Sequence, residues 1–275
     1  MSTQKTKCED FARLHREPGA FLIPNPWDVG SAKLLEGLGF KALATTSAGF
    51  AYTLAKTDGE VTLEEKVAHC AAVVAATSIP VNADFENGFA DAPEAVAANV
   101  LRVAKTGVAG CSIEDFGRDS HAIYDFNLAV ERIQAAAETA ATLGMPFQLT
   151  ARAENLLRGI DDLDDTIRRL KAYEVAGADV LYAPAIKSLD VLRQVTAELR
   201  KPFNALAVFF PGATIDELAA AGAKRISVGS GLAWASLSPL IKAGKEMLER
   251  GTFAWTTDMV AGADLRRLLR GRTPS

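Results

Sequence analysis

Two carboxylates at the end of one short apolar run are the first residues whose spacing indicates chemistry. In the stretch VNADFENGF, Asp84 and Glu86 are two residues apart, so on a strand both side chains project from the same face. Like charges held that close repel and shift each other's pKa unless a cation or a proton lies between them. The pair therefore indicates a place where a cation or a proton is held.

Further charged residues end other apolar runs. Glu114 follows the run GCSI, Arg152 and Glu154 share one face in TARAE, and Asp58 lies in AKTDGE. Carboxylate oxygens opposite an arginine suit a hard divalent cation that holds a carboxylate or phosphonate substrate, above all Mg2+, with Mn2+ as the alternative ion. Asp58 could instead be a solvated loop residue, and Arg152 could simply neutralise Glu154 or Glu114.

Repeated strand and helix patterns would bring these residues together. Eight short apolar runs predict strands at about 20–24, 42–47, 80–85, 110–115, 147–153, 180–184, 203–208 and 225–229. Helical periodicity fills the intervals between them, which predicts a TIM-type (β/α)8 barrel with its function at the carboxyl ends of the strands. The rival fold is an open doubly wound sheet, which would usually carry GxGxxG after its first strand, where this sequence reads PNPWDVGSAK.

The expected organisation is one barrel domain over residues 1–275. Residues 237–270 form an expected C-terminal helical extension that packs on a neighbouring subunit. Apolar residues make up 49% and charged residues 23% of the chain, which is typical of a globular protein.

Charge and hydropathy narrow the class of partner. The net charge of −4 and the lack of a basic run give no sign of nucleic-acid binding, so the expected partner is a small-molecule carboxylate. No apolar run is long enough for a membrane span, and the polar N-terminal stretch has no secretory apolar segment. The three cysteines match no zinc or redox spacing, so we expect a cytoplasmic protein.

A set of short motifs in a fixed order resembles a known superfamily. TTSAGF, VNADFENGF, SIED, TARAE and GADVLYAPA follow one another within residues 19–234, as in the isocitrate lyase and phosphoenolpyruvate mutase superfamily. The resemblance implies a TIM-type barrel, bound Mg2+ and a reaction through a 2-oxo acid or enolate. It also implies a homo-oligomer, a dimer or a tetramer, whose subunits exchange the final helix.

The resemblance assigns roles to individual residues. Asp84 matches the acid that ligates Mg2+, and Glu86 matches an acid that contacts the metal through water. Glu114 and Asp58 match the other two acids around the metal, and Arg152 matches the arginine that grips the oxo acid. The residues that match contacts to substrate carboxylates are Thr46, Ser47, Ala48, Gly49 and Asn204.

The segment FGRDSHAIYDFN (116–127) departs from both branches of the superfamily. It lacks the Lys-(Lys/Arg)-Cys-Gly-His motif of the lyases, and Cys111 points to the strand face opposite the acids. It also lacks the lysine-threonine-asparagine-serine run of the mutases, which have a histidine where Pro184 stands. Arg118 and His121 are the obvious reactive groups of this lid, and His121 is either an acid-base catalyst or an idle exposed residue.

These observations favour a magnesium-dependent carbon–carbon lyase that acts on a small 2-oxo or 2-hydroxy di- or tricarboxylic acid through an enolate. The expected catalytic residues are Arg152, Glu114 and His121. Phosphonopyruvate-type carbon–phosphorus hydrolysis or rearrangement is the first alternative. A barrel that binds an oxo acid without turning it over is the second.

Overall fold

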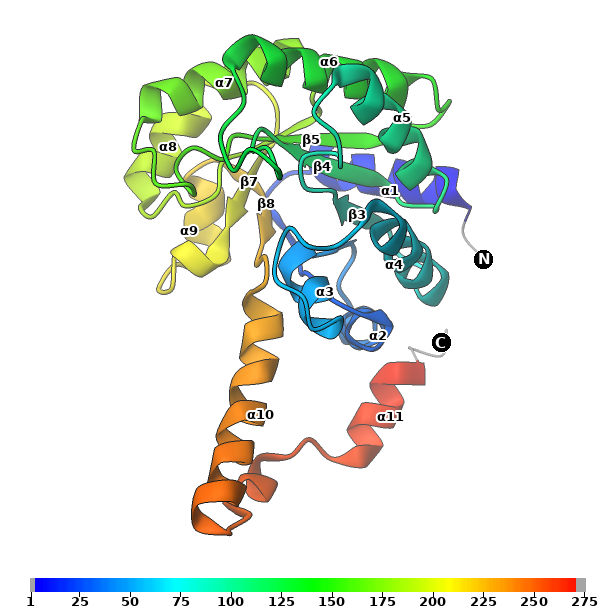
Figure 1. Cartoon of the computed structure of the whole chain (residues 1–275), viewed down its shortest axis with the longest axis vertical. Helices are drawn as coiled ribbons and strands as arrows, with labels where there is room; N and C mark the ends of the chain where they lie inside the picture. Colours follow the sequence, from blue (N-terminus) through cyan, green and yellow to red (C-terminus); the bar gives the residue numbers. More distant parts are fainter. Residues whose placement is uncertain (1–2, 271–275) are drawn as a thin grey trace.

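The computed structural model of the chain describes residues 3–270, in which eight parallel strands form the centre of the fold (Figure 1). The strands are β1 (Phe21–Ile23), β2 (Leu43–Ala44), β3 (Val81–Asp84), β4 (Gly110–Glu114), β5 (Gln148–Arg152), β6 (Val180–Tyr182), β7 (Phe203–Leu206) and β8 (Ala223–Ser227). Each strand overlaps its expected range. The predicted TIM-type (β/α)8 barrel is therefore confirmed.

One side chain closes the seam between the first two strands. The sheet runs β1-β8-β7-β6-β5-β4-β3-β2, and the backbone N–H of Ala44 donates to the carbonyl of Pro24 across the remaining gap at 3.1 Å. Asn25 donates through Nδ2 to the carbonyl of Thr45 at 3.2 Å, and its Oδ1 accepts the N–H groups of residues 228–229, each at 2.9 Å. Asn25 thus joins β8 to β2 beside β1, where no strand pairing exists among the described residues.

Helices surround the strands, and most of them begin at a capping side chain. They are α1 (Gln4–Arg16), α2 (Val29–Leu38), α3 (Ser47–Thr53), α4 (Leu63–Ala76), α5 (Pro93–Ala104), α6 (Phe126–Ala141), α7 (Leu163–Val175), α8 (Leu189–Ala197), α9 (Ile215–Ala220), α10 (Gly231–Arg250) and α11 (Gly262–Arg270), with short 3-10 turns at η1 (Ala207–Phe209) and η2 (Ala254–Asp258). Asp28, Thr62 and Thr214 form capping boxes at α2, α4 and α9. Gly39 ends α2 in the left-handed conformation, as expected for a glycine C-cap.

The alternation of residue types along β3, β4 and β5 separates the core from the site. One set of alternating residues is buried in the apolar core beneath the helices: Val81, Ala83, Cys111, Ile113, Leu149 and Ala151. The other set is polar and faces the barrel interior: Asn82, Asp84, Ser112, Glu114, Thr150 and Arg152. The strand period therefore carries the acids and the arginine to the same side, and it places Cys111 on the opposite face, as predicted.

The C-terminal extension is not one continuous helix. α10 ends at Arg250, where Gly251 forms its C-cap with φ +64°, and α11 follows after η2. α10 projects from the barrel, and α11 turns back to lie against α2 of the same chain (Figure 1). Apolar side chains of α10 remain exposed, including Leu240 at 66% and Leu248 at 91%. Within residues 3–270, no helix has both the length and the apolar character needed to cross a membrane.

Candidate functional site at the carboxyl ends of the strands

A row of polar residues crosses five neighbouring strands, at the carboxyl ends of β4, β5 and β6 and within β7 and β8. The strand register pairs Glu114 with Arg152, Arg152 with Tyr182, Tyr182 with Asn204 and Asn204 with Arg225. Each member of the row is buried or nearly so, and the alternation of each strand directs it inward. Charged and polar groups far apart in the sequence therefore meet inside the barrel.

Arg152 lies at the centre of the acids. Its Nη1 is 2.9 Å from Asp84 Oδ1, and its Nη2 is 2.7 Å from Glu154 Oε1 and 3.3 Å from Glu114 Oε2. Its Nε also donates to Glu154 at 3.0 Å, and the guanidinium lies 5.0 Å from the ring centroid of Tyr182. The predicted meeting of acids from adjacent strands with Arg152 is therefore present, and Glu154 is its closest acid.

Asp84 is held ionised by several donors. Burial raises its pKa, but Arg152, Lys66 and Ser47 lower it by more, so its pKa lies below the ordinary value. The backbone N–H of Ser47 donates to Oδ2 at 2.9 Å, and the N–H of Asp84 itself donates to Thr45 Oγ1 at 2.9 Å. Asp84 is thus a fixed carboxylate at the inner edge of the site.

Glu86 keeps one oxygen without a partner. Its backbone has φ +47°, its side chain is buried, and Oε1 finds no hydrogen-bond donor within residues 3–270. Arg118 Nε is 3.3 Å from Oε2. Burial raises the pKa of Glu86 to about 7, although Arg118 and Lys66 act in the opposite direction. A buried carboxylate with a free oxygen is suited to a water molecule or a cation.

Glu114 lies among several charges on the other side of Arg152. Burial first and then the neighbouring Glu154 raise its pKa well above the ordinary value. Arg158 Nη2 is 3.5 Å from Glu114 Oε1 and 3.4 Å from Glu154 Oε2, so it forms a second bridge between these acids. Asp58 lies apart from them in an exposed turn after α3, and its charge contributes to the raised pKa of Glu86.

The residues predicted to hold a substrate carboxylate form the start of α3. Thr46 is the N-cap, and its Oγ1 accepts the N–H of Gly49 at 3.2 Å. Ser47, Ala48 and Gly49 form the first helical turn, and a side chain at Gly49 would collide with Thr46 and Trp27. The stretch therefore lies directly beside Asp84, which accepts the Ser47 N–H.

Asn204 is the remaining predicted substrate contact, and it lies inside the barrel. Its Nδ2 donates to Ser227 Oγ at 2.9 Å, and its Oδ1 accepts Arg225 Nε at 2.8 Å. It belongs to the same register row as Arg152, two strands away.

The acids are suited to a metal bound through few direct contacts. Among residues 3–270, no three His, Cys, Asp or Glu side chains are close enough together to bind a metal directly. Asp84, Glu86 and Glu114 nevertheless offer only carboxylate oxygens, which Mg2+ prefers, and Glu86 has an oxygen to spare. The chemistry of this donor set therefore fits a hard cation such as Mg2+.

The lid over the acids is a small hairpin, and Arg118 is the side chain of this hairpin that contacts them. Phe116 and Ile123 pair as an antiparallel bridge. Arg118 reaches back to Glu86 and donates to the carbonyls of Gly59 and Val61, the latter at 2.6 Å. One guanidinium therefore ties together the loops that follow β2, β3 and β4.

His121 lies at the tip of this hairpin. It is exposed, with φ +49°, and the structure does not bring it to Arg152 or Glu114, with which it was grouped on sequence grounds. Its contact is with the ring of Phe116, at 6.4 Å between centroids. The tight turn directs His121 outward and leaves Arg118 as the lid side chain that faces the acids.

Lys66, a charged residue behind the site, was not predicted from the sequence. It is fully buried on α4 and donates to Thr45 Oγ1 at 3.2 Å, and it helps to lower the pKa of Asp84. It does not lie at the end of a strand, because it comes from a helix. The available signal was its helical spacing to Cys70 and Val73, which lie on the same buried face.

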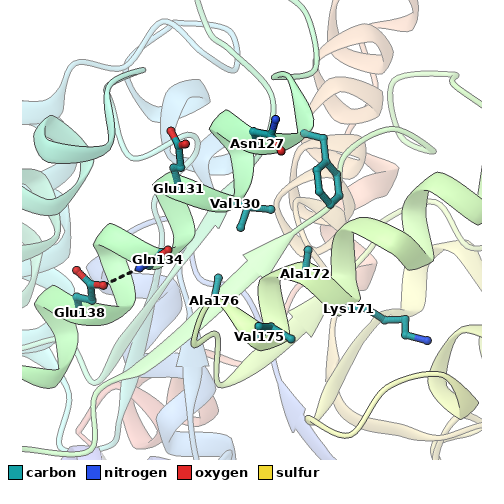
Figure 2. Close-up of a pocket in the computed structure, with 10 residues that line it drawn as sticks. Asn127, Val130, Glu131, Gln134, Glu138, Lys171, Ala172, Val175 and Ala176 are labelled. Atoms are coloured by element: carbon teal, nitrogen blue, oxygen red, sulfur yellow. Dashed lines mark hydrogen bonds between the residues drawn. The ribbon is translucent and has the colours of Figure 1, made fainter.

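A large surface groove lies elsewhere, between α6 and α7 (Figure 2). It has a volume of about 830 Å³ and is lined by Val130, Glu131, Glu138, Lys171 and Val175, among others. None of the residues of the strand-end site lines this groove. The convergence of charged groups, rather than the size of a hollow, therefore identifies the candidate site.

Comparisons with known proteins show what the chain is similar to. A family model described as phosphoenolpyruvate phosphomutase matches residues 11–248. A solved structure from Burkholderia cenocepacia J2315, provisionally described as a lyase/mutase, is similar with a TM-score of 0.90 at 48% identity, over 96% of this chain and 95% of that one. A 2-methylisocitrate lyase from Shewanella oneidensis is 28% identical over 252 residues, which are 86% of this chain and 84% of the relative. An oxaloacetate decarboxylase from Pseudomonas entomophila is 28% identical over 215 residues, 75% of this chain and 72% of the relative.

Proposed function

Because the chain belongs to the isocitrate lyase and phosphoenolpyruvate mutase superfamily, we propose that it is a magnesium-dependent lyase. Its substrate would be a small 2-oxo or 2-hydroxy di- or tricarboxylic acid, whose carbon–carbon bond breaks to leave an enolate. The observation that carries the proposal is the position of Arg152, within 3.3 Å of Asp84, Glu114 and Glu154. Relatives that act on 2-methylisocitrate and oxaloacetate support this class of substrate.

The residues of the chain divide the work of such a reaction. Breaking a bond next to a 2-oxo acid leaves negative charge on an enolate oxygen, which a fixed guanidinium stabilises better than mobile water does. Arg152 is fixed for this role by Glu154 at 2.7 Å and by Glu114 at 3.3 Å. Ser47 and its neighbours at the start of α3 would hold the substrate carboxylate beside Asp84.

The acids would hold the cation. Asp84 would bind Mg2+ directly, and Glu86, Glu114 and the exposed Asp58 would contact its water ligands; Mn2+ has the same preference for oxygen. Bound Mg2+ would supply a Lewis acid for the 2-oxo carboxylate unit. The lid residue Arg118 would then close the site against water, since it joins the three loops above the acids.

A substrate panel with and without EDTA tests this function. The panel should hold 2-oxo and 2-hydroxy di- and tricarboxylic acids together with phosphonopyruvate, and products should be identified by mass spectrometry and a phosphate assay. Two carbon fragments formed only with Mg2+ would support a carbon–carbon lyase. Pyruvate with inorganic phosphate would identify carbon–phosphorus chemistry instead, and oxalate binding without turnover of any member would identify a binding protein.

We also propose that the chain forms a homo-oligomer. α10 exposes Leu240, Ile241 and Leu248 at 66%, 56% and 91%. Apolar groups along one projecting helix favour burial against a second copy. Sedimentation velocity should therefore give a dimer or a tetramer, and Leu248→Glu should shift the population toward monomer. A monomeric parent chain at micromolar concentration would contradict this assembly.

A further inference from the structure

Arg225 on β8 is a buried charged residue that has no role in the reaction proposed above. Its side chain is 3% exposed, and it donates to Asn204 Oδ1 at 2.8 Å and to Thr150 Oγ1 at 3.1 Å. No carboxylate lies within 4.0 Å of it among residues 3–270. Only two of the five N–H groups of this guanidinium are satisfied by described residues.

Other buried arginines of the chain are satisfied differently. Arg169 pairs with Asp115 at 3.2 Å and with Asp165 at 2.6 Å. Arg132 donates to four backbone carbonyl oxygens and stacks on the ring of Tyr124. Arg225 has neither an acid nor a shell of carbonyls, and an uncompensated buried charge costs several kcal/mol unless an anion joins it. Burial accordingly lowers the pKa of Arg225 to about 10.

The contact with Asn204 fixes the direction of an amide group. A guanidinium can only donate, so Oδ1 of Asn204 must face Arg225 and its NH2 group must point away from it. One amide hydrogen goes to Ser227 Oγ at 2.9 Å. The second hydrogen has no acceptor among residues 3–270, and it lies in the register row that leads through Tyr182 to Arg152.

We propose that Arg225 is a positioning residue that holds Asn204 as a donor to the second carboxylate of a dicarboxylic 2-oxo acid and supplies the countercharge for that carboxylate. The inference rests on the proposed function, because it places the first carboxylate of the substrate beside Ser47 and Asp84. It adds a reason for the site to select a dianion: Arg152 is surrounded by acids, whereas Arg225 is not. A monocarboxylic 2-oxo acid would leave this charge without a partner.

Two inhibitors of different length test the role of Arg225. Oxalate imitates only the 2-oxo carboxylate end of a substrate, whereas 3,3-difluorooxaloacetate adds a second carboxylate beyond it. Isothermal titration with Mg2+ should show that Arg225→Met weakens binding of difluorooxaloacetate at least about tenfold and changes oxalate binding less than about threefold. The Tm should not fall, because the substitution removes an uncompensated buried charge.

Lys224→Met is the matched control. It removes one positive charge from the next residue of the same strand, where Lys224 donates to backbone carbonyls of Glu17 and Gly19 away from the site. Affinity for both inhibitors should stay within about twofold of the parent. The double variant Arg225→Met with Asn204→Ala should bind difluorooxaloacetate no more weakly than the single variant that has the larger loss of affinity, because both changes remove the same contact.

Asn204→Asp provides a second test that does not depend on the folding of Arg225→Met. The new carboxylate would pair with Arg225 at the present 2.8 Å contact, which should raise the Tm and abolish difluorooxaloacetate binding while oxalate still binds. The role of Arg225 would be overturned, and the proposed function left standing, by either of two results. One is an equal loss of affinity for both inhibitors, and the other is unchanged affinity for difluorooxaloacetate in Arg225→Met or in Asn204→Asp. Failure of the parent protein to bind either inhibitor would overturn both.

Discussion

Replacement of Arg152 by lysine tests the centre of the proposed site. The guanidinium of Arg152 contacts Asp84 at 2.9 Å and Glu154 at 2.7 Å from two different nitrogens, while Nε makes a third bond at 3.0 Å. A lysine ammonium is a single point charge on a flexible stem, so it cannot reproduce this fork. Arg152→Lys keeps the charge and removes the geometry.

The size of the effect follows from the contacts that are lost. The side chain of Arg152 is only 12% exposed, so solvent cannot replace its bonds. Loss of two charge-assisted hydrogen bonds from a buried group should lower the free energy of unfolding by about 2–4 kcal/mol. Loss of a fixed donor to the developing enolate charge should lower kcat by at least about tenfold and toward about a hundredfold.

Steady-state kinetics and urea unfolding measure the two effects separately. Arg168→Lys is the matched control, because Arg168 is 59% exposed and pairs with Asp165 on the surface, and it should leave both quantities unchanged. If Arg152→Lys retains more than about a tenth of the parent turnover, the fork is not needed and the assigned role of Arg152 is wrong.

The lid, two histidines and the barrel seam give further predictions. Arg118→Ala should lower kcat/KM more than about tenfold, because it opens the lid and leaves the buried carboxylate of Glu86 unpaired. His121→Ala removes only an exposed ring and should lower kcat/KM less than about threefold. The reverse order in steady-state kinetics would contradict the observed hairpin. Burial lowers the pKa of His15 and of His69 to about 3, below the value of 6.5 expected when unfolded, so protons bind the unfolded chain preferentially as the pH falls. The contribution of these two histidines to the free energy of unfolding is therefore fully present above pH 6.5. It is lost toward pH 3, by up to about 1.4 kcal/mol per pH unit for each histidine. The free energy of unfolding of His69→Gln, measured in urea, should fall less steeply between pH 7 and pH 5 than that of the parent protein. An unchanged dependence on pH would refute this prediction. Asn25→Ala removes three hydrogen bonds across the seam and should lower the free energy of unfolding by about 2–4 kcal/mol in urea; a loss below about 0.5 kcal/mol would show that other contacts close the barrel.

Local patterns in the sequence predicted the barrel and the meeting of its charged residues. Short apolar runs between helical segments are a direct consequence of parallel strands buried on both faces, and eight of them allow few other folds. The period of two along β4 and β5 then aims Glu114 and Arg152 at the same interior, where they are 3.3 Å apart. This part of the site depends on strand geometry alone, so it could be predicted.

The remaining features depend on contacts between distant segments. Lys66 reaches the site from a helix, and Arg225 is unusual only because no acid lies near it in space. Which lid residue faces the acids is decided by a tight turn that exposes His121 and turns Arg118 inward. The break after α10 is marked in the sequence by Gly251, which ends the helix in the left-handed conformation.

Titration of oxalate in the presence and absence of Mg2+ tests the central claim most directly. Asp84 is the buried acid assigned to the metal, while Asp58 lies in an exposed turn and serves as the comparison. Oxalate should bind the parent protein only when Mg2+ is present, Asp84→Asn should abolish this binding, and Asp58→Asn should weaken it by less than about tenfold. Equal binding of oxalate without Mg2+, or undiminished Mg2+-dependent binding by Asp84→Asn, would contradict a metal-dependent oxo-acid site at the carboxyl ends of these strands.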